Sequence, residues 1–130
     1  MAISSDMRYP WYDEAYVAVT TPVVSGKMHA IYLQVIRLAN QSMHDQPMAA
    51  VALKGGAVVN RATNGNKFGL HAEWRALRGK GDADTIVVAR HNGGMSRPCL
   101  ECQEVLKERG VYRMVYGDRN GVLVVERLYK

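Results

Sequence analysis

The sequence predicts one α/β domain, a five-stranded mixed sheet with helices on both faces, in three layers and with the last two strands antiparallel. Two observations carry this prediction. Segments with apolar residues at helical spacing alternate along the chain with short apolar or β-branched runs typical of strands. The chain also has 130 residues, 48% of them hydrophobic, which is enough for one core. We place the domain at residues 27–130 and an N-terminal arm without clear periodicity at residues 1–26.

The first predicted helix covers residues 27 to about 42, where apolar residues recur at three- and four-residue spacing. Two short apolar or β-branched runs follow, at residues 48–53 and 57–63. The Lys54-Gly55-Gly56 turn between them favours a hairpin. These runs are the first two predicted strands.

The second predicted helix runs from residue 71 to about residue 78 and ends at the glycines that follow, as helices often do. A buried strand is predicted next, at residues 84–90. The third helix runs from about residue 99 to residue 109, because Pro98 presets the backbone for a helix start and Gly110 stops it.

The last two predicted strands, at residues 111–116 and 122–128, form an antiparallel hairpin. The five turn-rich residues between them are too few for a parallel crossover, which needs about a dozen or more. The predicted order is therefore α-β-β-α-β-α-β-β.

Two motifs supply the residues of a metal site. His71-Ala72-Glu73 opens the second predicted helix, and Pro98-Cys99-Leu100-Glu101-Cys102 opens the third. Imidazole and thiolate suit zinc, and three protein ligands leave the fourth tetrahedral position open for water. Helix N-termini also favour the thiolate form that zinc requires. We predict His71, Cys99 and Cys102 as ligands of a Zn²⁺ cofactor, and a redox or purely structural Cys pair is the alternative.

Glu73 is predicted as the catalytic residue. H-x-E followed by P-C-x-x-C is the signature of zinc deaminases, in which the Glu moves protons and does not bind the metal. Glu73 lies two residues after His71, close enough to reach a water activated by the metal. It would take a proton from that water and pass it to the ring nitrogen and the leaving ammonia.

The two motifs, together with residues 87–102 and 110–116, resemble the cytidine deaminase-like superfamily, over roughly residues 27–128. The stretch is similar to small free-standing cytidine/deoxycytidylate deaminase-like enzymes of phages, viruses and microbes. This resemblance implies that Asn64 contacts the sugar of a substrate. It also implies that the backbone of Ala72 and of the segment Ser96, Arg97 and Pro98 holds the pyrimidine edge.

The functional prediction is a zinc-dependent hydrolase that converts a cytosine nucleoside or nucleotide to the uracil form and releases ammonia. The alternative is a nucleic-acid-editing deaminase that acts on cytosine in single-stranded DNA or RNA. The first is preferred because the chain lacks an obvious strand-binding appendage of interleaved aromatic and basic residues. An adenine- or guanine-directed deaminase shares the same metal site and stays open. Intact Glu73 argues against a domain that has lost catalysis.

Charge is distributed unevenly, since residues 51–130 hold 14 Lys and Arg against eight Asp and Glu, within a net charge of +5. Such a surface attracts phosphates of a mononucleotide or of a strand, and the alternative is a plain solubilising surface. Arg90 and Arg97, which flank the loop before the cysteines, are candidates for phosphate contacts or are plain surface charges.

The sequence also predicts where the protein is located and how it assembles. We expect no membrane partner and a cytoplasmic location, because the sequence has no apolar run of about 18 residues and no leader. Cysteines committed to a metal agree with a reducing compartment. Deaminases of the resembled superfamily often complete their pockets with a neighbouring subunit, so we predict a homo-oligomer, most simply a twofold dimer.

Overall fold

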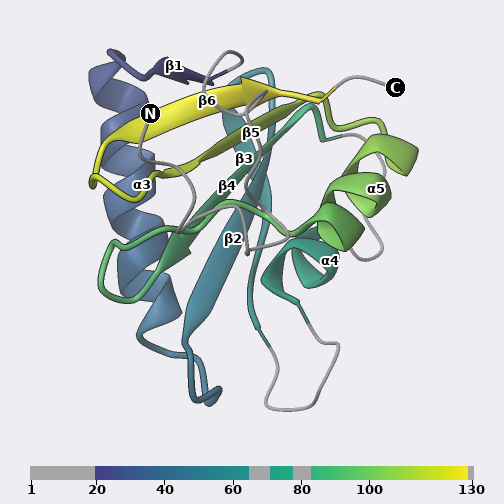
Figure 1. Cartoon of the computed structure of the whole chain (residues 1–130). Helices are drawn as coiled ribbons and strands as arrows, with labels where there is room; N and C mark the ends of the chain where they lie inside the picture. The colour runs from purple at the N-terminus through teal and green to yellow at the C-terminus, as the bar shows by residue number, and fades with distance from the viewer. Residues whose placement is uncertain (1–19, 65–70, 78–82, 129–130) are drawn as a thin grey trace, which may run out of the picture.

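The structure, a computed structural model, describes residues 20–64, 71–77 and 83–128 (Figure 1). Helices and strands alternate along these residues as the sequence predicts. The helices are α3 (Gly26–Ala39), α4 (Ala72–Leu77) and α5 (Leu100–Glu108). The strands are β1 (Thr20–Pro22), β2 (Met48–Lys54), β3 (Ala57–Thr63), β4 (Thr85–Arg90), β5 (Arg113–Gly117) and β6 (Leu123–Arg127). The glycines predicted to end the second helix, and most of the predicted arm, lie outside the described residues.

The described strands form one mixed sheet in the order β1-β6-β5-β4-β2-β3. Strands β4 and β5 are parallel, and every other neighbouring pair is antiparallel, including the predicted hairpin β5–β6. The prediction of five strands is wrong, because the sheet has six: β1 pairs with β6. A strand of three residues is too short to show a period of two, and its Pro22 is tolerated because β1 lies at the edge of the sheet. Strand β1 lies within residues 1–26, the predicted N-terminal arm. The boundary between the arm and the domain at residues 26 and 27 stays a prediction.

Two hydrophobic cores lie on opposite faces of the sheet. Successive residues of β2 belong to different cores: Ala50 and Ala52 to one, Ala49 and Val51 to the other. The first core includes residues of α4 and α5, and the second includes residues of α3. Figure 1 shows α3 on one side of the sheet and α4 and α5 on the other. Strands β2 and β4 are therefore covered on both faces, which explains why both are almost continuously apolar.

Strand β3 contains a β-bulge that changes the face of its side chains. The register with β2 shifts between the pairs Leu53↔Val58 and Ala52↔Asn60, so Val59 has no partner. As a result Val58 packs with the core of α3, whereas Ala62 packs with the core of α4 and α5. In a regular strand these two residues would share one face.

Local sequence explains where helices begin and end. Ser25 caps α3, since its hydroxyl accepts a hydrogen bond of 3.2 Å from the amide of Met28. This helix ends at Ala39, three residues earlier than predicted. Among the described residues, no helix is both long enough and apolar enough to cross a membrane.

Candidate functional site

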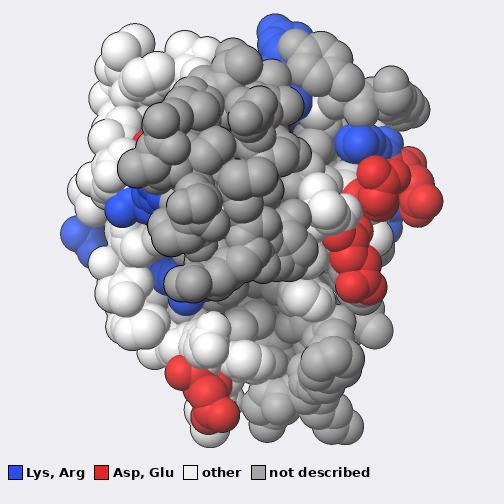
Figure 2. Space-filling model, viewed as in Figure 1, with Lys and Arg blue, Asp and Glu red and all other residues white. Residues whose placement is uncertain are grey.

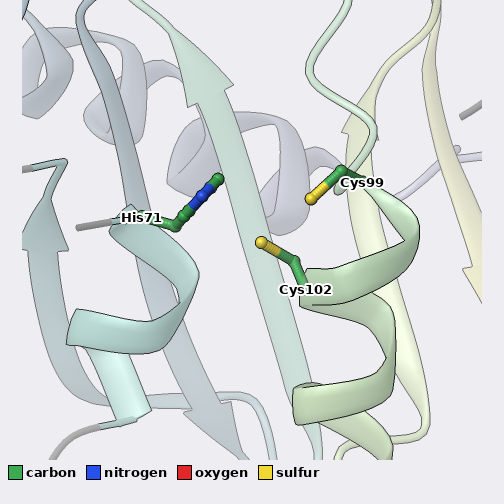
Figure 3. A group of neighbouring side chains, drawn as sticks. All are labelled: His71, Cys99 and Cys102. Atoms are coloured by element: carbon green, nitrogen blue, oxygen red, sulfur yellow. The ribbon is translucent and has the colours of Figure 1, made fainter. Parts of the chain in front are cut away.

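The starts of α4 and α5 converge. His71 directly precedes α4, and its carbonyl accepts the hydrogen bond of the Arg75 amide at 3.1 Å. Cys99 is the N-cap of α5, and Cys102 lies in the first turn of that helix. Figure 3 shows the three side chains pointing toward one another from the two helices. The structure thus brings together the three residues that the sequence predicts as ligands.

The nitrogen and sulfur atoms of these side chains are spaced for one metal ion. They all lie within 4.8 Å of one another. Donor atoms bound tetrahedrally to one zinc ion lie about 3.3–3.8 Å apart, given ordinary zinc–ligand distances. Within the described part of the chain, no fourth His, Cys, Asp or Glu belongs to the group.

The two thiols differ in acidity. A hydrogen bond from the Cys102 thiol is the main cause that lowers the pKa of Cys99 from 9.0 to about 5. The same hydrogen bond, with burial and the nearby Glu73, raises the pKa of Cys102. The pair therefore holds one thiolate and one thiol at neutral pH. A metal ion bound by both sulfurs would displace the remaining proton.

Glu73 lies beside this group without being part of it. The residue is 4% exposed, and burial is the main cause that raises the pKa of its carboxyl group. A hydrogen bond from the backbone and the nearby His71 partly offset that effect. A carboxyl group with a raised pKa both takes up and releases protons closer to neutral pH, which suits a general acid/base.

A network of buried hydrogen bonds holds the loop that leads to Cys99. The Ser96 hydroxyl donates to the carbonyl of Val88 at 2.9 Å and accepts from the amide of Gly117 at 3.1 Å. The side chain of Gln103 donates to the carbonyl of Pro98 at 2.8 Å. The cysteine loop is therefore fixed to the ends of β4 and β5 and to the first turn of α5.

Arg97 is buried and paired with Glu126 of β6. Its Nε and Nη2 atoms each donate to one carboxylate oxygen of Glu126 at 2.9 Å, and the Tyr116 hydroxyl donates to the same carboxylate at 2.7 Å. The interpretation of Arg97 as a plain surface charge is wrong, because the residue is 8% exposed. A role in binding phosphate finds no support here, since the guanidinium is bound to Glu126.

Glu126 is the residue of this network that sequence reasoning misses. It sits in an apolar strand where a single Glu normally faces solvent. It lies opposite Met114 in β5, and Met114 belongs to the core of α4 and α5. Residues directly opposite each other in an antiparallel pair share a face, so the carboxylate points into that core. A basic residue 29 positions earlier in the chain gives no local signal of this pairing.

Asn64 organises the loop between α3 and β2. Its side-chain oxygen accepts hydrogen bonds from the Ser42 hydroxyl at 2.6 Å and the Met48 amide at 3.0 Å. Its side-chain nitrogen donates to the carbonyl of Gln46 at 2.9 Å. The predicted sugar contact of Asn64 stays a prediction, as do the substrate contacts of Ala72 and of residues 96–98.

Arg90 ends β4 and is half-buried. Its Nε atom is buried with no hydrogen-bond partner among the described residues. His91, the next residue, is exposed. Arg90 thus stays a candidate for an anion contact, whereas nothing in the structure gives His91 a role in the site.

Comparison with known proteins gives no match by sequence, since neither a protein-family model nor a curated protein matches the chain. Solved structures do match. The chain superimposes on a cytidine deaminase from Burkholderia pseudomallei with a TM-score of 0.61 and 20% identity, over 77% of this chain and 91% of the other. It superimposes on a dCMP deaminase from the cyanophage S-TIM5 with a TM-score of 0.54 and 19% identity, over 73% and 86% of the two chains.

The chain shares the fold of these two solved deaminases. A third neighbour is the diaminohydroxyphosphoribosylaminopyrimidine deaminase/5-amino-6-(5-phosphoribosylamino)uracil reductase of Thermotoga maritima, with a TM-score of 0.50 and 24% identity. The match covers 69% of this chain but only 30% of that larger protein. The resemblance predicted from the two motifs is confirmed at the level of the cytidine deaminase-like fold.

Proposed function

We propose that the protein is a zinc-dependent deaminase that converts a cytosine nucleoside or nucleotide to the uracil form and releases ammonia. The observation that carries the proposal is the convergence of His71, Cys99 and Cys102 within 4.8 Å, with the buried carboxyl group of Glu73 beside them. The fold is shared with proteins described as a cytidine deaminase and a dCMP deaminase, which favours cytosine as the base.

His71, Cys99 and Cys102 would hold the metal. One imidazole and two sulfurs, one of them readily ionised, fit zinc better than the harder cations that prefer oxygen. Three ligands without a fourth also fit a catalytic site more than a structural one. When bound, zinc supplies a Lewis acid that makes water a nucleophile near neutral pH.

Glu73 would move the protons of the reaction. As a carboxylate it takes a proton from the attacking water, whose oxygen forms a bond to C4 of the base. As a carboxylic acid it gives that proton to ring nitrogen N3. It then takes the second proton from the oxygen now bound to C4 and gives it to the amino nitrogen, so that the C4–N bond breaks, ammonia leaves and the C4 carbonyl of the uracil form remains. Both forms are needed in one cycle, and burial brings the pKa of Glu73 toward the range where both are accessible.

The buried network around Ser96 and Arg97 would keep the cysteine side of the site in place during this cycle. Its hydrogen bonds join the loop to β4, β5 and β6, so the sulfurs are supported by strands and not by a free loop. Such support preserves the geometry on which catalytic rates depend.

The test is a substrate panel. Purified protein supplied with zinc is incubated with cytosine, adenine and guanine nucleosides, nucleotides and oligonucleotides, and ammonia release is followed. We expect a cytosine compound to be turned over. Glu73→Gln should lower turnover by at least about 100-fold while zinc content stays near one ion per chain. Glu108→Gln, the same change at an exposed position near the end of α5, is the matched control. Absence of turnover with every base would contradict the proposal.

A further inference from the structure

An open groove runs around the edge of the sheet at β3, between α3 and α4. It consists of two adjoining hollows of about 540 and 270 Å³. The larger is lined by residues of α3, β3 and α4, and the smaller continues from it along α3. The two share Leu38, Gln41 and Arg61. We call this surface the β3 groove.

Among the described residues that line the β3 groove, every charged side chain is an arginine. Arg37 comes from α3, Arg61 from β3 and Arg75 from α4. In the part of the chain that the structure describes, no Asp or Glu lines either hollow and no carboxylate forms a salt bridge with any of the three. Like charges gathered without a counter-ion focus a positive potential and attract anions.

The arginines lie around β3, an edge strand whose position is fixed by its contacts with β2 and α4. Because of the bulge at Val59, Arg61 lies opposite Val51 and shares the face covered by α3, while Asn60 faces α4. The side chain of Asn60 donates a hydrogen bond of 2.7 Å to the carbonyl of Ala76 in α4. The edge strand is thereby tied to the helix that carries Arg75, so charges on both sides of the sheet edge keep their spacing.

The groove adjoins the candidate metal site. Arg75 lies one helical turn after His71, and its amide donates to the His71 carbonyl at 3.1 Å. Side chains four positions apart lie on the same face of a helix. The arginine at the α4 end of the β3 groove is therefore a neighbour of a predicted metal ligand.

We propose that the β3 groove binds the phosphate backbone of a single-stranded nucleic acid that leads to the candidate metal site, an inference that rests on the deaminase chemistry of the proposed function and extends its substrate to a nucleotide within a strand. Three guanidinium groups from three elements suit several successive phosphates better than the single phosphate of a mononucleotide. Gln34, Gln41 and Thr63, which also line the groove, can donate hydrogen bonds to sugars and phosphates. A single strand is required because a base must be unpaired to enter a deaminase site.

A second copy of the chain fits the groove less well. Two β3 edges paired with each other would bring Arg61 of both copies together, and like charges close together are destabilising. The surface of a second copy that best complements the groove in charge is the acidic outer face of α5, where Glu101, Glu104 and Glu108 are exposed. Figure 2 shows Asp and Glu side chains gathered over this helix. An oligomer that joins this face to the β3 groove is an outcome that the experiment distinguishes.

The experiment is a titration of the full chain with labelled single-stranded DNA and RNA, read by fluorescence anisotropy over a range of salt concentrations. For single strands, the logarithm of the association constant falls with the logarithm of the salt concentration with a slope of about −0.7 per neutralised phosphate. Each lost phosphate contact should therefore weaken binding about fourfold at roughly 0.15 M salt. We expect Arg61→Ala to lose that much and the triple change Arg37→Ala, Arg61→Ala, Arg75→Ala about fiftyfold, with a flatter slope. Arg119→Ala, at an exposed turn between β5 and β6, removes the same charge elsewhere and should leave affinity unchanged.

Several outcomes would overturn the inference: equal binding by the triple variant, equal affinity for duplex, or a mononucleotide that competes as well as a strand. It is also overturned if no strand binds and the triple change instead dissociates an oligomer in light scattering. Melting temperatures of all variants establish that they fold. Deamination of free nucleosides is measured separately. If nucleosides react but no strand binds, the groove inference fails alone. If the arginines bind a strand while no base is deaminated, the proposed function fails and the groove stands.

Discussion

The two halves of the candidate site are supported differently. The cysteines lie at the start of the nine-residue helix α5, behind a loop held by buried hydrogen bonds and by the Arg97–Glu126 pair. His71 precedes α4, a helix of six residues that is tied to β3 by the side chain of Asn60. The comparison teaches that the cysteine half is held by a network of buried side chains, whereas the histidine half depends on a short helix tied by Asn60 of β3 and by Arg109, which donates to the Leu77 carbonyl at 2.6 Å. Metal binding should therefore stabilise the histidine half more.

The largest expected effect is on the cysteine half. Glu126→Gln should destabilise the protein by about 3–5 kcal/mol, because Arg97 would remain buried without its counter-charge. Chemical denaturation measures the loss, and Glu108→Gln, an exposed Glu, should change stability by less than about 0.5 kcal/mol. Similar stability of both variants would show that the buried pair does not hold the cysteine loop. Arg97→Met combined with Glu126→Leu should recover part of the loss.

The next prediction compares how changes in the two halves of the site alter the stability that zinc adds. Wild-type protein should gain about 2.7 kcal/mol of stability when free zinc is a hundred times its dissociation constant. His71→Ala should abolish that gain yet leave metal-free stability nearly unchanged, since His71 is only half-buried. Cys102→Ala should abolish it and also lower metal-free stability, because Cys102 is fully buried in α5. Thermal melts with and without a chelator give both quantities.

His91→Ala, at an exposed position, is the control for the change at His71. It should retain the full zinc-dependent gain. A gain that survives in His71→Ala would mean that the nitrogen ligand is another residue.

A smaller effect tests the tether of the histidine half. Asn60→Ala removes the hydrogen bond to the Ala76 carbonyl and should cost about 1 kcal/mol of stability. Because α4 positions His71, zinc affinity measured by competition with a chelating dye should fall as well. Asn120→Ala, in the exposed turn between β5 and β6, should alter neither quantity. Unchanged zinc affinity in Asn60→Ala would indicate that α4 is held by its core contacts and by the hydrogen bond from Arg109 to Leu77.

The smallest effect involves Asp84, just before β4 and at the other end of that strand from the site. The amide hydrogen bond from Gly55 is the main cause that lowers the pKa of Asp84. A lowered pKa means that the ionised group stabilises the fold above its unfolded value of about 3.9 and that this contribution is lost as the pH falls further. Asp84→Asn should therefore be less stable than wild type at pH 7, with the difference shrinking below about pH 4. Unfolding curves across that range, with zinc absent, check the sign. A difference that grows on acidification would contradict the assignment.

How far the sequence predicts this molecule depends on the range over which each signal acts. The ligands and Glu73 could be predicted because each motif lies within five consecutive residues, and the structure brings the three predicted ligands together. The first helix was predicted from apolar periodicity over the whole element, the other two from the Pro or Gly residues at their ends, and five strands from short apolar or β-branched runs. Strand β1 has three residues and no period, so it was missed. The pairing of Arg97 with Glu126 joins distant positions, and the arginines of the β3 groove are contributed by three separate elements, so no local pattern reveals either.

The bulge in β3 has a consequence for chain length at this edge. Loss of Val59 would leave Val58 and Asn60 adjacent while preserving their present partners, Leu53 and Ala52. The flanking side chains would then keep their faces in an unbroken ladder. Loss of Arg61 or Ala62 would instead turn the following residues to the opposite face and pull Asn64 out of its loop. A deletion scan of β3 should therefore find one tolerated product, the chain that lacks one valine of the Val58-Val59 pair, whereas a gap at Arg61 or Ala62 disrupts the sheet.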